Sequence, residues 1–286
     1  MLERPYPEVE RRTRLFLDGA RTDFGLDDAA IERLVPRLSS RDGQSRLFAE
    51  IENTIGAGYF SVSRSIMEAG CGTGSFVVPA LERGHDAWGI DNDPVRLDVA
   101  FARIDEYGLP ADWKTRMPLG DATNTPFAPD SFDVVLGHQF IEHVPDPAGA
   151  ISEMLRVVKP GGFVVLYAPD YRAPFEAHYE IPWPPFAARW MLECWLDAFE
   201  RPYGGLSSIF PVTLLQLAGI FQSLNCDLVC ARNDFEIEPH VGRHFVMNDK
   251  GTIRATALQM RAAQAAGSLP RSFTMPTSLA IAARKR

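Results

Sequence analysis

The sequence predicts an α/β protein whose seven-stranded, mostly parallel sheet carries helices on both faces. From Ile66 onward, short apolar runs alternate with amphipathic segments, and this alternation is typical of parallel strands joined by crossover helices. A glycine-rich turn follows the first apolar run, as at the ligand-binding edge of such sheets. Of the 286 residues, 46% are hydrophobic and 23% charged, which is consistent with a globular chain that has a substantial core.

We expect four regions along the chain. Residues 1–62 lack a strand pattern, and apolar residues at helical spacing around Ile31 and Phe48 predict two or three helices ahead of the core. The ligand-binding core spans 63–170, an aromatic-rich insertion spans 171–210, and the rest of the core sheet spans 211–286.

The first core strand ends in Glu68, and a turn with Gly70, Gly72 and Gly74 follows. Glycine has no Cβ, so it allows the backbone to turn sharply and a ligand to come close. An apolar helix then leads to a second strand that ends in Asp91, where a carboxylate can accept both hydroxyls of a ribose. Together these features predict a pocket for a nucleoside-bearing cofactor.

The later elements have clear boundaries. Asp93-Pro94 and Asp146-Pro147 each supply an N-cap followed by proline at the first helical position, and these two helices stop near Gly108 and Pro160. Buried strands four and five are expected at 132–136 and 163–167. A helix at 212–224, strand six at 227–231 and strand seven at 278–283 complete the sheet.

The insertion at 171–210 interrupts this alternation and holds three of the five tryptophans, Trp183, Trp190 and Trp195. So many aromatic rings must bury their surface against a ligand, a partner chain or the core. Because the insertion follows strand five at the ligand-binding edge, we favour a substrate-binding cap. A homodimer contact is the second interpretation and ordinary core packing the third.

The glycine spacing identifies the cofactor class. The dinucleotide fingerprint G-x-G-x-x-G is broken at Ser75, whereas Glu68 to Gly74 reads E-x-G-x-G-x-G. This pattern resembles motif I of the class I S-adenosylmethionine-dependent methyltransferases, a Rossmann-like family, and the resemblance covers about 66–167. A carboxylate such as Glu68 suits the positively charged sulfonium and ammonium groups of S-adenosyl-L-methionine.

The resemblance implies roles for individual residues. Asp91 would hold the ribose and Asn92 would pack beside the base. The segment Gly120-Asp121-Ala122 would follow the third strand, and Asp121 with the backbone of Ala122 would recognise adenine, although Asp121 could instead be a turn residue. In this family an extension such as 1–62 often covers the cofactor as a lid; here it could simply cap the sheet. The full set of expected cofactor contacts is Glu68, Gly70, Cys71, Gly72, Gly74, Asp91, Asn92, Asp121, Ala122 and His138.

The segment 132–144 resembles the family's fourth motif, and His138 with Gln139 would emerge near the methyl sulfonium. The step Glu142-His143-Val144 also resembles ubiquinone-biosynthesis O-methyltransferases, in which an earlier Glu, the Glu and the His are linked to a divalent metal. Here Gln139 replaces the earlier carboxylate, and a neutral amide is a poorer ligand for a hard cation. The sequence therefore predicts no metal.

A base that removes the hydroxyl proton of the acceptor speeds methyl transfer to oxygen, and histidine changes its protonation near neutral pH. His143 and His138 are the first candidates, and His178 in the insertion is the third. Each could instead be a structural imidazole bonded to the backbone.

The composition limits the classes of binding partner that we expect. The net charge of −8 argues against a broad phosphate-binding face, the cysteines lack metal-ligand spacing, and no signal peptide or membrane span is evident. We expect a cytoplasmic methyltransferase that uses S-adenosyl-L-methionine and O-methylates a small or medium-sized metabolite, lipid-like or sugar-containing acceptor, without nucleic-acid or membrane partners. The alternatives are a protein or RNA methyltransferase, a non-catalytic cofactor-binding subunit and a nicotinamide oxidoreductase.

Overall fold

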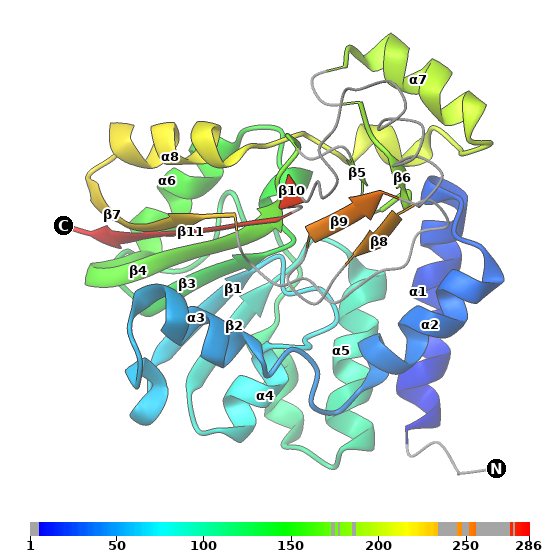
Figure 1. The fold of residues 1–286 in the computed structure, drawn as a ribbon. Helices are drawn as coiled ribbons and strands as arrows, with labels where there is room; N and C mark the ends of the chain where they lie inside the picture. Colours follow the sequence, from blue (N-terminus) through cyan, green and yellow to red (C-terminus); the bar gives the residue numbers. More distant parts are fainter. Residues whose placement is uncertain are drawn as a thin grey trace.

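The structure is a computed structural model that describes residues 6–172, 175–176, 178–184, 187–233, 245–247, 252–255, 275–276 and 278–286. Its main sheet has six strands in the order β2-β1-β3-β4-β11-β7 (Figure 1). The first four strands run parallel, and β11 is antiparallel to both of its neighbours. The predicted α/β class with a mostly parallel sheet is confirmed. The strands are β1 (Ser65–Ala69), β2 (Asp86–Ile90), β3 (Phe132–His138), β4 (Val158–Pro169), β7 (Cys226–Arg232) and β11 (Ser278–Lys285).

The prediction of seven strands is wrong, because the strand expected before Gly120 does not form. The chain there makes the 3₁₀ helix η2 (Ala111–Arg116) and then a single bridge between Leu119 and Asp91. Pro118 has no N–H to donate to a ladder, so pairing is limited to contacts around Asp91. These contacts still hold the 118–120 segment beside the carboxyl end of β2.

Helices cover both faces of the sheet (Figure 1). On one face, α3 (Leu47–Ile55), α4 (Val77–Glu82) and α5 (Pro94–Glu106) bury their apolar sides, and on the other lie α6 (Pro147–Val157) and α8 (Leu214–Ser223). The two Asp-Pro starts are confirmed. The Asp93 carboxylate accepts from the Val95 N–H at 2.8 Å, and that of Asp146 accepts from the Gly149 N–H at 3.0 Å.

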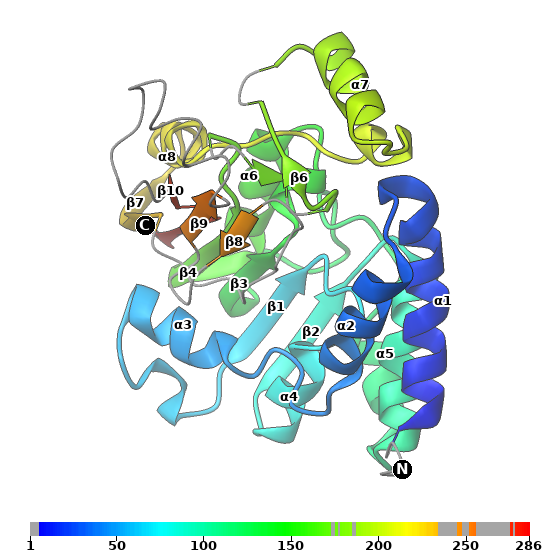
Figure 2. The ribbon, with the colours of Figure 1, turned by 45° about the vertical axis from the view of Figure 1, so that its right-hand side comes forward.

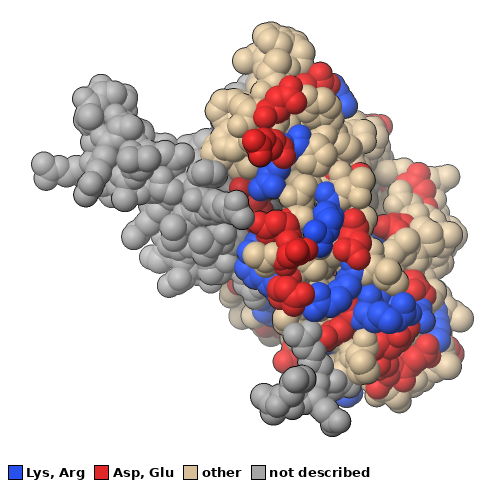
Figure 3. Space-filling view, turned by 90° about the vertical axis from the view of Figure 1, so that its right-hand side faces the viewer, with Lys and Arg blue, Asp and Glu red and all other residues tan. Residues whose placement is uncertain are grey.

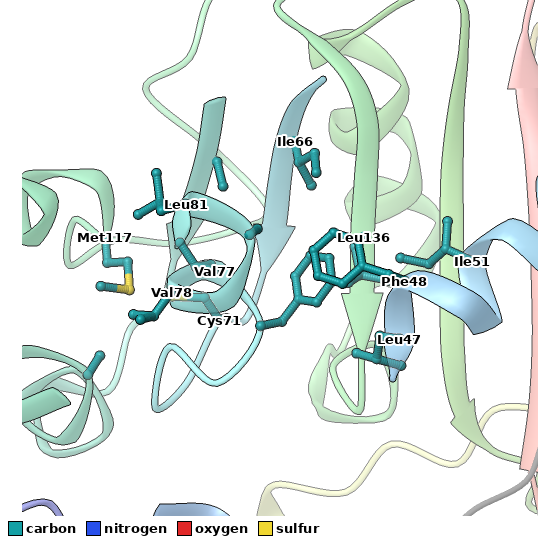
Figure 4. Packing of buried hydrophobic residues seen from close by; sticks show 14 of the residues in the cluster. Leu47, Phe48, Ile51, Ile66, Cys71, Val77, Val78, Leu81, Met117 and Leu136 are labelled. Atoms are coloured by element: carbon teal, nitrogen blue, oxygen red, sulfur yellow. The ribbon is translucent and has the colours of Figure 1, made fainter. Parts of the chain in front are cut away.

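The core on the α3–α5 face joins the N-terminal helices to the glycine loop. Figure 4 shows Phe48 and Ile51 of α3 beside Leu136 of β3, with Cys71 next to Val77 at the start of α4. The N-terminal region is therefore packed onto the sheet through a shared hydrophobic cluster.

A buried arginine adds a polar link between the same two regions. Arg103 of α5 donates to the carbonyls of Thr73 in the glycine loop (3.0 Å) and of Ser40 (2.7 Å), as well as to the carbonyl of Leu38. Its guanidinium also donates to the Tyr107 hydroxyl at 2.9 Å. The segment that leaves α2 (Asp28–Ser39) is thus held against the loop.

The helix α1 (Pro7–Phe24) lies along α5, as both ribbon views show (Figures 1 and 2). Basic and acidic side chains are interspersed on the face shown in Figure 3. The N-terminal helices carry ion pairs such as Arg11–Glu8 (2.7 Å) and Arg21–Asp28 (2.6 Å).

The insertion forms a separate small cluster above the sheet edge. It contains the paired strands β5 (Phe175–Glu176) and β6 (Ile181–Pro182), the helix α7 (Arg189–Ala198) and the 3₁₀ helix η4 (Gly204–Ser207). Tyr179 and Trp183 are buried there, and Phe24 of α1 packs against the cluster. Trp190, in contrast, is 66% exposed.

Three further short strands, β8 (Phe245–Met247), β9 (Thr252–Ala255) and β10 (Met275–Pro276), form an antiparallel sheet. Among the described residues, every helix is too short or too polar to cross a membrane.

Candidate functional site

The glycine loop between β1 and α4 has the backbone that its sequence requires. Gly70, Gly72 and Gly74 all have positive φ angles, of 68°, 50° and 66°, a region that side chains with a Cβ rarely adopt. A Cβ at Gly70 would also lie 2.7 Å from the Phe140 ring, and one at Gly74 would lie 2.9 Å from the Ala100 Cβ. Glycine is therefore favoured at all three positions by backbone conformation, and at Gly70 and Gly74 by close packing as well.

Asp91 joins this loop to the end of β2. Its buried carboxylate accepts from the Gly72 N–H at 2.7 Å through Oδ2 and from the Asp93 N–H at 2.9 Å through Oδ1. The carboxylate thus holds the loop at the carboxyl edge of the sheet, where an open α/β fold binds its ligand.

Glu68 is buried directly beneath the loop. Its Oε2 has no hydrogen-bond partner among the described residues, and burial together with nearby Asp91 raises the pKa of its carboxyl well above the usual range. A buried polar atom without a partner is costly. The ammonium of a methionine moiety would satisfy it, so this position fits S-adenosylmethionine.

Cys71 contributes its backbone to the loop rather than its thiol. The side chain points into the core (Figure 4), and a Cβ added at Gly89 of β2 would lie 2.5 Å from the Cys71 Cβ. The Cys71 N–H donates to the Ile90 carbonyl at 3.1 Å.

The adenine-end residues lie near this edge but differ in their surroundings. Asn92 is exposed, whereas Ala122 is buried in the core. Asp121 is exposed, and its Oδ1 accepts from the N–H and hydroxyl of Thr123 at 2.8 and 2.7 Å. That geometry is an Asx turn, the alternative role considered for Asp121. The Gly120 N–H donates to the Asp91 carbonyl at 2.9 Å and keeps this turn next to β2.

His138 is the last residue of β3. Its ring centroid lies 6.3 Å from that of Tyr167 on β4. Burial, with a smaller contribution from Arg46 and Arg37, lowers the pKa of His138 to about 3. His138 is therefore neutral near pH 7 and a weak proton acceptor. The chain then turns at Gln139, whose φ of 52° is unusual for a residue with a side chain.

His143 lies in the 3₁₀ helix η3 (Ile141–His143). Its Nδ1 is 2.7 Å from the Ser208 carbonyl, and because a carbonyl can only accept, Nδ1 carries the proton and Nε2 keeps its lone pair. Burial and the neighbouring His178 lower the pKa of His143 to about 4.

His178 reaches the same place from the insertion. Its Nδ1 is 2.6 Å from Oε1 of Glu176, a buried carboxylate that also accepts from the Tyr171 hydroxyl (3.1 Å) and the Tyr179 N–H (2.7 Å). Burial opposes a charged imidazole, but the Glu176 carboxylate outweighs it and raises the pKa of His178.

Glu142 completes a cluster with these two histidines. One atom each of Glu142, His143 and His178 lie within 4.8 Å of one another, and the two imidazole centroids are 4.9 Å apart. Glu142 is fully buried, both of its oxygens lack a partner in the described part of the chain, and burial raises its pKa to about 7.

The cluster lies close to the glycine loop. Phe140, two residues before Glu142, is the residue that a Cβ at Gly70 would strike. Arg96 of α5 lies 3.9 Å from the position of a Cβ at Gly72, and its charge acts on Glu142 and both histidines. The structure therefore brings the loop, Asp91 and the cluster to one edge of the sheet.

Two carboxylates in this cluster were not among the sequence candidates. Glu142 entered the sequence analysis only through its resemblance to a metal-linked Glu of ubiquinone-biosynthesis O-methyltransferases, and Glu176 was assigned no role. The Glu-x-His spacing of Glu176 and His178 could have predicted their contact, because it allows the carboxylate to reach the imidazole.

Comparisons with known proteins agree with this architecture. Residues 67–166 match the family described as "Methyltransferase domain". The chain is 35% identical over 115 residues to an uncharacterized methyltransferase of Mycobacterium sp. (strain KMS), which covers 40% of this chain and 42% of that protein. It is 33% identical over 140 residues to a ubiquinone biosynthesis O-methyltransferase of Stutzerimonas stutzeri, covering 48% and 59%. The chain thus spans about two-fifths to three-fifths of the length of these relatives.

A solved structure of a SAM-dependent methyltransferase from Archaeoglobus fulgidus superimposes with a TM-score of 0.52 at 19% identity, covering 95% of this chain and 99% of that one. That likeness shows a shared fold, which is the Rossmann-like methyltransferase fold. The matched domain, independently of that fold, agrees with the recognition made from the motifs: residues 67–166 form a methyltransferase domain of the class I S-adenosylmethionine-dependent kind.

Proposed function

We propose that this protein transfers the methyl group of S-adenosyl-L-methionine to a hydroxyl of a small or medium-sized metabolite, one that is lipid-like or contains a sugar. The glycine loop with its three positive φ angles carries the proposal, because Asp91 holds the loop and Oε2 of Glu68, beneath it, has no partner among the described residues. The matched methyltransferase domain covers this loop.

In the proposed complex, Glu68 faces the methionine ammonium, and the backbones of Gly70, Cys71 and Gly72 line the methionine portion. Asp91 binds the ribose hydroxyls. The base lies against Asn92, with Asp121 and the Ala122 N–H at its edge and His138 near the sulfonium. Asp121 can serve the base through Oδ2, because the turn to Thr123 uses Oδ1.

The acceptor end is assigned to the cluster of Glu142, His143 and His178. Methyl transfer from a sulfonium is an in-line displacement that mainly requires alignment of the two reactants and exclusion of water. Removal of the acceptor's hydroxyl proton adds to the rate, and we place that step at this cluster. The insertion 171–210 would then act as a cap over the acceptor, because it supplies His178 and Glu176, and the 1–62 region would close the cofactor side.

The test is a turnover screen with methyl-labelled cofactor. We expect label in a small hydroxylated compound from a metabolite extract, and none in protein or RNA. Label only in macromolecules would contradict the acceptor class. Binding of the cofactor without turnover on any acceptor would support a non-catalytic subunit.

A further inference from the structure

The cluster of Glu142, His143 and His178 has a second chemical capacity. Two of its members come from the η3 turn at the end of β3, and the third comes from the insertion 35 residues later. We propose that these three side chains bind a divalent transition-metal ion that joins the insertion to the core at the edge of the cofactor cleft.

The donor atoms converge without any change in fold. One donor atom from each residue lies within 4.8 Å of the other two. In a tetrahedral zinc site with bonds of 2.0–2.1 Å, ligand atoms are about 3.4 Å apart. Rotation of the three side chains, with the backbone unchanged, can shorten the distances between the donor atoms to this value.

Both imidazoles use Nδ1 for a hydrogen bond, which leaves Nε2 as the atom that can face a metal ion. Nδ1 of His143 contacts the Ser208 carbonyl and Nδ1 of His178 contacts the Glu176 carboxylate, at 2.7 and 2.6 Å. Each Nδ1 therefore holds its proton, and Nε2 is the atom left to bind a metal ion, which would displace any proton that Nε2 carries. Such a partner behind each histidine is the usual arrangement in metal sites, where it fixes ring orientation and increases basicity.

Glu142 provides the independent observation that points to a ligand. Its side chain is fully buried, yet neither carboxylate oxygen has a hydrogen-bond partner among the described residues. A buried carboxylate left in this state is costly, and a cation between it and the histidines would remove that cost.

The donor set decides the class of cation. Two imidazoles with one carboxylate suit zinc, iron(II) and similar ions, whereas magnesium prefers oxygen ligands and water. In the sequence, Gln139 stands where a carboxylate was expected, and this substitution argued against a metal site. The fold supplies an imidazole from His178 instead, which changes the expected ion from a hard cation to a transition metal.

The charges around the site balance in favour of a cation. Glu142 and Glu176 each contribute a carboxylate, and Arg96 opposes them. Arg96 is 38% exposed, and its Nε lies 3.3 Å from Asp93, so both solvent and this partner weaken its effect. Three protein ligands also leave a coordination position open, where an acceptor oxygen could bind. Metal binding would deepen the proposed function. Only the binding of an acceptor oxygen at the open position rests on that function.

The test uses the full chain after removal of metals by a chelator, with Cys194→Ser as the background because that thiol is exposed. Cobalt(II) is the probe, and its visible absorption reports coordination without any need for turnover. We expect one equivalent to bind and zinc to displace it, with magnesium unable to compete at millimolar concentration. No uptake by the parent protein, or stronger binding of magnesium than of zinc, would overturn the proposal.

Variants separate this site from other histidines. His178→Gln and Glu142→Gln should each weaken binding at least 100-fold, and Glu176→Gln should weaken it 10–100-fold through the orientation of His178. Glu193→Gln, an exposed carboxylate on α7, is the matched control and should bind as the parent does. Circular dichroism checks folding, and if Glu142→Gln is unfolded, His178→Gln alone decides. Unchanged cobalt binding in folded His178→Gln would refute the ligand set.

Titration of S-adenosylhomocysteine into the same samples distinguishes the two proposals. Binding of this compound without uptake of cobalt would refute the metal site and leave the methyltransferase function standing. Uptake of cobalt without binding of S-adenosylhomocysteine would do the reverse.

Discussion

Replacement of Arg103 by methionine tests how the N-terminal region supports the cofactor loop. The guanidinium is buried, and all four of its partners are neutral oxygens, three of them main-chain carbonyls. Burial lowers the pKa of this arginine. Methionine keeps most of the aliphatic stem but donates no hydrogen bond.

The expected loss of stability follows from these partners. A buried acceptor left unpaired costs about 1–3 kcal/mol. Thr73 is buried, so its carbonyl bears this cost, whereas the half-buried Leu38 and Ser40 can recover water. Removal of a buried charge also returns part of its desolvation cost. We therefore expect Arg103→Met to lower the free energy of unfolding by about 1–3 kcal/mol and to weaken cofactor binding, because Thr73 lies between two loop glycines.

Urea unfolding gives the first quantity and calorimetry with S-adenosylhomocysteine gives the second. Arg11→Met, on the exposed side of α1, is the control and should change stability by less than about 0.5 kcal/mol. The free energy of unfolding of Arg103→Met could instead lie within about 0.5 kcal/mol of the parent value, with equal affinity for S-adenosylhomocysteine. That result would show that Arg103 does not link the N-terminal region to the loop.

Three further predictions concern the site. Asp91→Ala removes the proposed ribose acceptor and the partner of the Gly72 N–H, so affinity for S-adenosylhomocysteine should fall by about 1.5–3 kcal/mol; unchanged affinity in calorimetry would remove Asp91 from the site. His143→Ala should leave cofactor binding intact and slow turnover about 10²–10⁴-fold, and equal rates would make His143 structural. His138 is held neutral with its pKa at about 3, below the unfolded value of about 6.5, so its contribution to stability is present above pH 6.5 and is lost as the pH falls. Between pH 7 and 5 the parent should lose about 1–2 kcal/mol more than His138→Asn in urea unfolding, and parallel losses would contradict the assigned pKa.

Local sequence signals predicted most of the fold. The Asp-Pro starts placed α5 and α6 because capping and a proline-compatible first turn are properties of neighbouring residues. The glycines of the loop were equally informative, since their positive φ angles exclude most other residues. The missing strand near Pro118 shows the limit of that approach, because the family pattern implied a strand where Pro118 has no N–H to donate and only one bridge forms.

The candidate site depended on contacts that a sequence does not display. Arg103 lies on an amphipathic helix, where a charged residue is expected to face solvent, yet tertiary packing buries it under the loop. Glu176 and His178 meet Glu142 and His143 only because the insertion folds back over the end of β3. The residue types of this cluster were visible in the sequence, but their convergence was not.

The proposed methyltransferase activity depends above all on the loop between β1 and α4 binding an adenosyl sulfonium compound. Calorimetric titration of the unmodified chain with S-adenosylhomocysteine, and separately with NAD, tests this directly. We predict saturable one-to-one binding of S-adenosylhomocysteine and no heat of binding for NAD. Tight binding of NAD with none of S-adenosylhomocysteine would contradict the account.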